Sequence, residues 1–169
     1  MHVSLAEAAK ALADRIRSLG DRVHVVAHSL GGLVACEAFA TRQDLPPGRA
    51  VLLGSPVRGA RAARAVAERW YGAAMLGPLA VAELACERDC AWHSPREVGV
   101  IAGSRSVGIG RVFADLPVPN DGTVCVDETA LSGASAQLVL DVSHTGMLLS
   151  SAVAAATVQF LRSGSFGTS

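Results

Sequence analysis

The sequence has no excess of either charge and no long apolar stretch. Its 169 residues include 15 Lys and Arg and 15 Asp and Glu, so the formal net charge is zero. A nucleic-acid-binding protein usually carries a strong basic excess, which this composition lacks. No run of about 18 apolar residues passes without a polar one, so a membrane-spanning helix is not expected. The composition therefore excludes the nucleic-acid-binding and integral membrane classes.

Cysteine is also scarce, and the four present lack the paired spacing that binds zinc. Cys86 and Cys90 are four residues apart and would share one helix face, but a disulfide there would need an oxidising compartment. The first residues, Met1–Glu7, lack the basic and then apolar order of a signal peptide. We therefore expect a cytoplasmic protein with reduced, structural thiols and with neither a metal nor another cofactor.

Hydrophobic residues make up half of the chain, and charged residues only 18%, which excludes a disordered protein. A chain of this length buries roughly 70% of its unfolded surface, so it needs no disulfide to hold a core. We expect a single domain over residues 1–169. The alanine-rich segment 58–96 is a candidate helical lid, with ordinary packing helices as the alternative.

Short apolar runs alternate with helical patterns along the chain. The runs predict strands at 23–27, 50–54, 98–103 and 137–141. Helices are predicted at four places, namely 4–19, where Ser4 and Glu7 form a capping box, 31–41, within 58–84, and 145–161. Continuous apolar runs suit parallel strands that are covered on both faces. This alternation predicts an α/β fold with a short, mostly parallel sheet of about four strands.

The strongest motif lies between the first predicted strand and the following helix. It reads Ala27, His28, Ser29, Leu30, Gly31 and approximates the G-x-S-x-G nucleophile elbow. The residues two before and two after the serine must be small, because their side chains face each other across a sharp turn. The turn also puts the serine at a helix N-terminus, where backbone N–H groups favour a developing anion. Ser29 is therefore the candidate nucleophile, and a simple helix cap is the alternative.

A serine nucleophile needs a base, and the base needs a carboxylate to orient it. Asp121 follows the third predicted strand, and His144 follows the fourth. The carboxyl ends of parallel strands meet at one edge of a sheet, so these side chains can converge on Ser29. The order Ser, Asp, His is the order found along an α/β-hydrolase chain.

Each of these residues has rivals. The other candidate acids are Asp115, Asp127 and Asp141, of which Asp127 is nearest in the chain. Among the histidines, we expect His28 to point to the opposite side of the turn from the serine. The remaining ones fall in a frayed start, inside a strand and in the candidate lid, and they are His2, His24 and His93.

These motifs resemble those of lipase-type α/β-hydrolases, the small bacterial lipases and esterases. The resemblance is carried by residues 27–32, 53–56, 120–122 and 143–148, and it covers most of the chain. It implies a three-layer sandwich with Ser29 as nucleophile, Asp121 as acid and His144 as base. It also implies that the backbone N–H of Leu30 is one donor of the oxyanion hole.

The chain departs from this family at its start. Family members begin with further strands, one of which ends in a His-Gly turn that supplies the second oxyanion N–H. This sequence begins at the helix before the nucleophile strand, so residues 23–27 would form an exposed hydrophobic edge. We expect either that another chain covers this edge, in a homodimer or higher oligomer, or that the gene starts upstream of Met1.

The leading hypothesis is a serine hydrolase of small or lipid-like carboxylic esters that works through an acyl-enzyme and is slowed by one missing oxyanion donor. The alternative is a truncated, non-catalytic module that keeps the elbow but only binds. A third idea is binding of anionic surfaces through a stripe of arginines, for which a solvated helix face is the simpler explanation. The stripe consists of Arg58, Arg61, Arg64 and Arg69.

Overall fold

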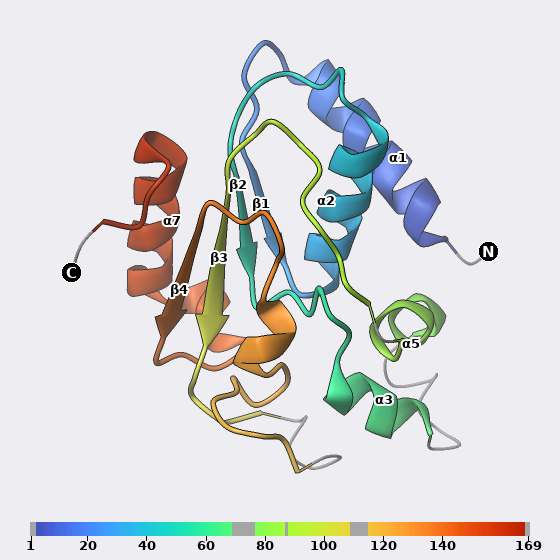
Figure 1. Cartoon of the computed structure of the whole chain (residues 1–169), viewed down its shortest axis with the longest axis vertical. Helices are drawn as coiled ribbons and strands as arrows, with labels where there is room; N and C mark the ends of the chain where they lie inside the picture. Colours follow the sequence, from blue (N-terminus) through green and yellow to red (C-terminus); the bar gives the residue numbers. More distant parts are fainter. Residues whose placement is uncertain (1–2, 69–76, 87, 109–114, 168–169) are drawn as a thin grey trace.

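A four-stranded parallel sheet lies at the centre of the molecule (Figure 1). Its strands are β1 (Val25–His28), β2 (Ala50–Leu53), β3 (Val98–Gly103) and β4 (Ala136–Leu140). They pair in the order β1-β2-β3-β4, with every pairing parallel. The structure is a computed structural model that describes residues 3–68, 77–86, 88–108 and 115–167. The predicted α/β class and parallel sheet are confirmed.

Helices cover both faces of the sheet. On one face lie α1 (Leu5–Ser18) and α2 (Leu30–Thr41), and on the other lies α7 (Ser151–Ser163) (Figure 1). Side chains of β2 alternate between the two layers, as the pleat of a strand requires. Leu52 belongs to the core cluster that includes Phe39 of α2, whereas Val51 belongs to the cluster that includes Phe160 of α7. The result is the three-layer sandwich that the sequence predicts.

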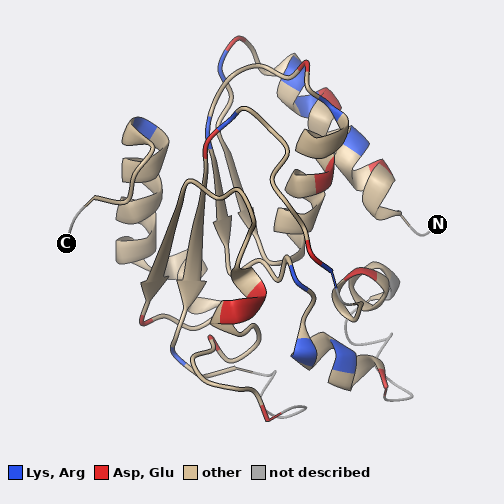
Figure 2. Ribbon diagram, viewed as in Figure 1, with Lys and Arg blue, Asp and Glu red and all other residues tan. Residues whose placement is uncertain are grey.

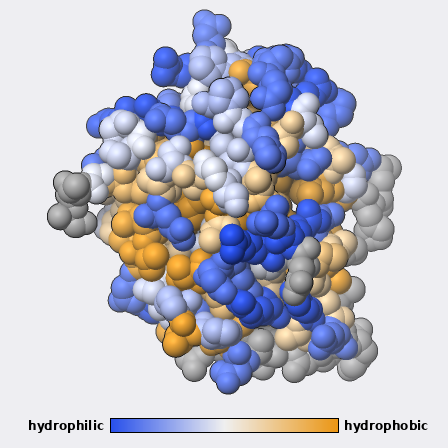
Figure 3. All heavy atoms as spheres, in the orientation of Figure 1, coloured by the Kyte–Doolittle hydropathy of each residue, from blue (hydrophilic) through white to orange (hydrophobic). Residues whose placement is uncertain are grey.

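Charge is absent from all four strands and gathers in the helices and loops (Figure 2). A strand that is buried on both faces cannot hold an unpaired charge, because desolvation is costly. β2 and β3 are accordingly buried along their whole length. The outer strands are more open, with Val26 of β1 49% and Val139 of β4 44% exposed. Figure 3 shows hydrophobic residues reaching the surface on the side of β4 and α7.

The first helix forms as its sequence predicts. The Ser4 side chain accepts a hydrogen bond from the backbone N–H of Glu7, and the Glu7 carboxylate accepts one from the backbone N–H of Ser4. This capping box satisfies N–H groups that a helix start leaves without partners. The buried face of α1, which carries Ala9, Ala13 and Ile16, packs against α2.

The described part of the chain between β2 and β3 contains two short helices. They are α3 (Arg61–Ala67) and α5 (Pro78–Leu84), and they contact each other. Ala63 and Leu84 from these helices share an apolar cluster with Leu33 of α2, while Leu30 packs against it. A lid role for segment 58–96 remains a prediction. None of the described helices is long and apolar enough to cross a membrane.

The predicted helix at 145–161 is wrong over its first six residues. The chain instead forms a short 3-10 helix, η2 (Gly146–Leu149), and α7 begins only at Ser151. Ser150 has an extended backbone, and its side chain accepts a hydrogen bond from the backbone N–H of Val153. A serine that caps a new helix interrupts the apolar pattern without changing its spacing, which is why periodicity alone missed the break. A second 3-10 helix, η1 (Val126–Thr129), precedes β4.

Candidate active site

Ser29 lies at the turn from β1 into α2. Its backbone has φ 54° and ψ −126°, and it is the one non-glycine residue with positive φ in the described part of the chain. Such a conformation costs about 1–3 kcal/mol and persists only where the surroundings enforce it. The Ser29 N–H donates to the carbonyl of Leu53 at 2.9 Å, and the Ser29 carbonyl accepts from Gly32 N–H at 3.0 Å. The sheet and the helix thus hold the turn from both sides.

Gly31 and Gly32, at the start of α2, differ in how closely the neighbouring side chains approach them. A Cβ placed on Gly31 would lie 3.8 Å from the Cβ of Ala27, an ordinary contact. The two positions therefore face each other as predicted, but an alanine fits at both. The tighter approach is at Gly32, where a Cβ would overlap the Cβ and Oγ of the fully buried Ser55. Gly32 therefore sets how closely α2 can approach the end of β2.

Two backbone donors follow the serine. The N–H groups of Leu30 and Gly31 open the 12-residue helix α2, and neither has an acceptor among the described residues. Such N–H groups, reinforced by the helix dipole, favour an anion at this end of the helix. The Leu30 N–H is the donor that the sequence predicts for an oxyanion hole.

Asp121 is buried and holds His144 in place. One oxygen of its carboxylate, Oδ1, accepts from the backbone N–H groups of Thr123 at 2.9 Å and Val124 at 2.7 Å. The other, Oδ2, lies 2.7 Å from Nδ1 of His144, and the Asp121 carbonyl accepts from the His144 N–H at 2.9 Å. An ionised carboxylate can only accept, so Nδ1 carries the proton and Nε2 keeps its lone pair.

The loop around Asp121 is held by its neighbour Asn120, which is also buried. The Asn120 Oδ1 accepts from Ser106 Oγ at 2.7 Å and from Gly122 N–H at 2.9 Å. Its Nδ2 donates to the carbonyl of Pro117 at 3.0 Å. The sequence suggests only a turn former here. The sequence signal for a larger role is the position of Asn120 beside the candidate acid. A buried amide must find partners for all its polar atoms, and here those partners hold the loop that carries Asp121.

The His28 side chain lies beside His144, a contact that the sequence analysis did not foresee. Its Nε2 lies 3.1 Å from the carbonyl of His144 and donates to it, and the two imidazole rings are 4.6 Å apart. The physical reason is the alternation of β1, which buries Ala27 against α2 and turns His28 to the opposite face, where the His144 loop passes. Burial lowers the pKa of His28, and the neighbouring His144 lowers it further.

The end of β2 brings these groups together. Gly54 follows β2 with φ 51°, and a Cβ there would lie 3.1 Å from Asp121 Oδ2 and 3.2 Å from His144 Nδ1. The backbone N–H of Ser29 donates a hydrogen bond to the carbonyl of Leu53, the last residue of β2. All three candidate residues therefore lie at one end of the sheet. No hydrogen bond joins Ser29 Oγ to His144 within the described residues, which is common in enzymes without bound substrate.

The rival acids lie at the surface. The Asp127 side chain is 61% exposed and binds Arg61 through both oxygens, which lowers the pKa of its carboxyl. Asp141 is exposed and pairs with Arg105, and Asp115 is exposed as well. Of the four candidate acids, Asp121 is therefore the one that is buried and bonded to a histidine.

The remaining candidates do not join this group. His24 accepts a hydrogen bond from the backbone of Arg49 before β2, and His93 is exposed. His2 and Arg69 lie outside the described residues. In the predicted arginine stripe, Arg61 is tied to Asp127, and Arg58 lies 3.9 Å from Asp89.

Burial suppresses the reactivity of three of the four thiols, and the fourth, Cys86, is exposed. The four cysteines are all free, and burial raises the pKa of Cys36 to about 12 and of Cys125 to about 11. Burial also raises the pKa of Cys90. A thiol with a raised pKa holds little of the thiolate that reacts.

Comparison with known proteins finds similarity in structure alone. No protein-family model matches the chain, and no curated protein sequence does. The solved structure of a lipase from Bacillus licheniformis in its propeptide form matches with a TM-score of 0.69 and 21% identity over 85% of this chain. Its mature form matches with a TM-score of 0.67 and 18% identity over 94% of this chain. The chain spans 37% of the propeptide form and 74% of the mature form, and the arrangement that they share is the α/β-hydrolase fold.

Proposed function

We propose that this protein is a serine hydrolase of carboxylic esters. The observation that carries the proposal is the backbone of Ser29, held at positive φ at the start of α2 beside two free N–H groups. A protein gains nothing in stability from a strained serine, and strain of this kind clusters at active sites. The buried Asp121–His144 pair at the same end of the sheet supplies the other groups that the reaction needs. The likeness to a lipase structure supports the same class.

The proposed reaction has two halves. Ser29 Oγ attacks the ester carbonyl carbon while its proton moves to Nε2 of His144, and the carbonyl oxygen becomes an anion beside Leu30 N–H. The carbon–oxygen bond to the alcohol then breaks, and the alcohol leaves with the proton from Nε2. Water repeats the attack on the acyl-enzyme and releases the carboxylic acid and free Ser29. Asp121 keeps the imidazole oriented and stabilises its charged form.

We propose that turnover is slow for an enzyme of this class. Leu30 and Gly31 supply the free N–H groups next to Ser29, but both point from one helix end. In the family that the sequence resembles, a second donor comes from another loop. Loss of one such donor typically costs about 10²–10³ in turnover.

A fluorophosphonate probe tests the proposal directly, because it reacts with an activated serine and needs no knowledge of the substrate. We expect labelling of Ser29 and hydrolysis of a short p-nitrophenyl ester, with both lost in Ser29→Ala. Ser18→Ala, a change at an exposed serine that ends α1, is the control and should keep both. Unlabelled wild-type protein would favour the non-catalytic module, and equal hydrolysis by Ser29→Ala would refute the assignment of the nucleophile.

A further inference from the structure

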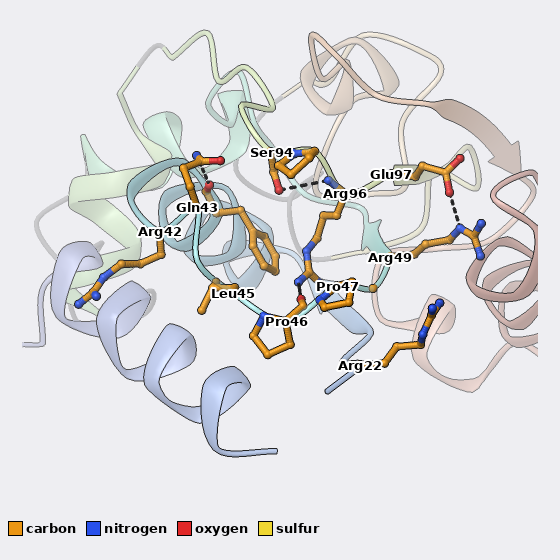
Figure 4. A pocket seen from close by; sticks show the side chains of 13 residues that line it. Arg22, Arg42, Gln43, Leu45, Pro46, Pro47, Arg49, Ser94, Arg96 and Glu97 are labelled. Carbon is orange, nitrogen blue, oxygen red and sulfur yellow. Dashed lines mark hydrogen bonds and ion pairs between the residues drawn. The ribbon is translucent and has the colours of Figure 1, made fainter. Parts of the chain in front are cut away.

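A cavity of about 450 Å³ lies at the end of the sheet opposite Ser29 (Figure 4). Its lining includes Arg22, Arg49 and Arg96, which come just before β1, β2 and β3, whereas the candidate catalytic residues follow their strands. The last turn of α2 and the loop after it complete the wall. The volume falls within the roughly 300–1,000 Å³ of typical small-molecule sites. This cavity is therefore separate from the candidate active site.

The most unusual residue in the cavity wall is Arg96. It is only 8% exposed, and its guanidinium donates to the backbone carbonyls of Val23, at 2.9 Å, and Pro46. The guanidinium carbon also lies 4.3 Å from the centre of the Phe39 ring. No carboxylate lies within ion-pair distance of it in the part of the chain that the structure describes. Arginine is rarely so buried without an acidic partner, so its charge is left uncompensated.

The cavity wall as a whole is cationic. Arg22, Arg42, Arg49 and Arg96 line it, and Glu97 is the one acid among the lining residues. Glu97 is already engaged, since its Oε2 lies 2.5 Å from Nε of Arg49. Figure 4 shows Arg96 beside Pro46 and Pro47, with the Arg49–Glu97 pair to one side.

The excess of positive charge affects the pKa of the nearby His24. Its pKa is lowered, first by burial and then by the charges of Arg22, Arg49 and Arg96. Arg42 interacts with two carboxylates, Asp14 and Asp44, and its charge lowers the pKa of both. These carboxylates offset part of the positive charge of Arg42. Arg22 and Arg96 form no ion pair with any of the described residues, so their charges are available to an anion in the cavity.

The apolar part of the wall defines the rest of the ligand. Five apolar residues line the cavity together with the arginines, and they are Phe39, Leu45, Pro46, Pro47 and Pro95. A guanidinium prefers carboxylate and phosphate oxygens, and an apolar wall prefers hydrocarbon. We propose that this cavity binds a small organic anion, a carboxylate or phosphate monoester on an apolar body. The proposal does not depend on Ser29 or on ester hydrolysis.

Calorimetric titration of the full chain with phenyl phosphate tests the site, with benzyl alcohol as the neutral analogue. We expect phenyl phosphate to bind at least about tenfold more tightly, because only it carries a negative charge to pair with the arginines. Arg22→Gln is the deciding variant, since the Arg22 side chain makes no hydrogen bond within the described residues and its loss should not disturb folding. We expect this variant to weaken binding about fivefold or more. Arg15→Gln, which removes the same charge from the exposed face of α1, should bind like the wild type.

His24 provides a second readout that depends on position. A bound anion should cancel part of the arginine potential and raise the pKa of His24, which proton NMR measures during a pH titration with and without phenyl phosphate. The proposal is overturned if phenyl phosphate does not bind, if benzyl alcohol binds equally well, or if Arg22→Gln binds as the wild type does. An unmoved His24 titration with bound phenyl phosphate would place the ligand elsewhere and overturn it as well.

Discussion

Asp121 holds His144 through both its carboxylate and its backbone carbonyl. In Asp121→Asn the backbone bond stays, but an amide can present its N–H to Nδ1 and so favour the wrong tautomer. Loss of the orienting carboxylate costs about 10⁴ in rate in a well-studied triad, and we expect a loss approaching that in kcat for ester hydrolysis.

Asp127→Asn is the matched control. It changes the same atoms in a side chain that is 61% exposed and that pairs with Arg61 at the surface, so kcat should stay close to that of the wild type. The assignment of the acid is wrong if the Asp127 variant is the inactive one.

Gly54 offers a way to disturb the Asp121–His144 pair without changing either residue. A Cβ on Gly54 would press on both side chains, at 3.1 and 3.2 Å, and would also strain a backbone with φ 51°. We expect Gly54→Ala to lower kcat at least about tenfold, since small displacements of catalytic groups are costly. Gly77→Ala is the control, because Gly77 also has positive φ, at 77°, but a Cβ there meets nothing within 4 Å. Equal kcat in the two variants would show that strain alone, and not contact with the pair, decides the effect.

The half-buried ring of His28 makes stability depend on pH. Its pKa in the folded protein lies below the ordinary value because burial disfavours the charged ring. The unfolded chain therefore binds a proton more readily, so the free energy of unfolding falls as the pH drops below about 6.5. In His28→Gln this loss between about pH 7.5 and 5.5 should shrink, though not vanish, because the pKa of His24 is lowered too. Urea unfolding at both pH values measures this change in the free energy of unfolding. His93→Gln, at an exposed histidine, is the control and should show the same change as the wild type.

Sequence reasoning predicted that Ser29, Asp121 and His144 lie at one end of the sheet, because chain order and strand ends constrain where side chains can meet. It did not foresee that His28 contacts His144, because the tertiary fold decides which loop passes that face of β1. It also gave Asn120 no role, because the need to satisfy a buried amide becomes visible only once burial is known.

At the scale of elements, the approach of α2 to β2 depends on one missing methyl group. A Cβ on Gly32 would overlap Ser55, whereas one on Gly31 would meet only Ala27 at 3.8 Å. We expect Gly32→Ala to lower the free energy of unfolding by about 1–3 kcal/mol through overpacking. Gly31→Ala should be neutral, or more stable by up to about 1 kcal/mol, because alanine is the better helix former. Chemical denaturation measures both, and similar values for the two variants would contradict this account of the elbow.

The strands were predicted closely and the helices less so. The third predicted strand has the same bounds as β3, since a run that is apolar on both faces has few other solutions. The helix predicted at 145–161 failed at Ser150, and the four-residue turn η1 was not predicted at all. Short 3-10 helices carry too few residues to show a period, so they depend on tertiary contacts.

At the scale of the whole molecule, β1 has a strand on only one side within the described residues. An open edge offers unpaired N–H and C=O groups to another chain, and Val26 adds an exposed apolar side chain. We expect a homodimer that joins near this edge, since two-fold pairing is the commonest closed arrangement. Light scattering at micromolar concentration should give about twice the chain mass of 17.3 kDa.

Val26→Lys tests where the two chains meet. A lysine on an edge strand discourages pairing, so this variant should scatter as a monomer. Lysine at Val139, which is similarly exposed on β4, is the control and should leave the dimer intact. A wild-type monomer would rule out this association.

The strands follow one another across the sheet in the same order as along the chain. During synthesis each new strand can therefore add to the free side of the one before it, without waiting for a later segment to be inserted between them. Ser29 emerges from the ribosome with the first strand, while His144 follows the fourth. Under the proposed mechanism, a nascent chain that has not yet made His144 would carry an inert serine, because the base would still be missing.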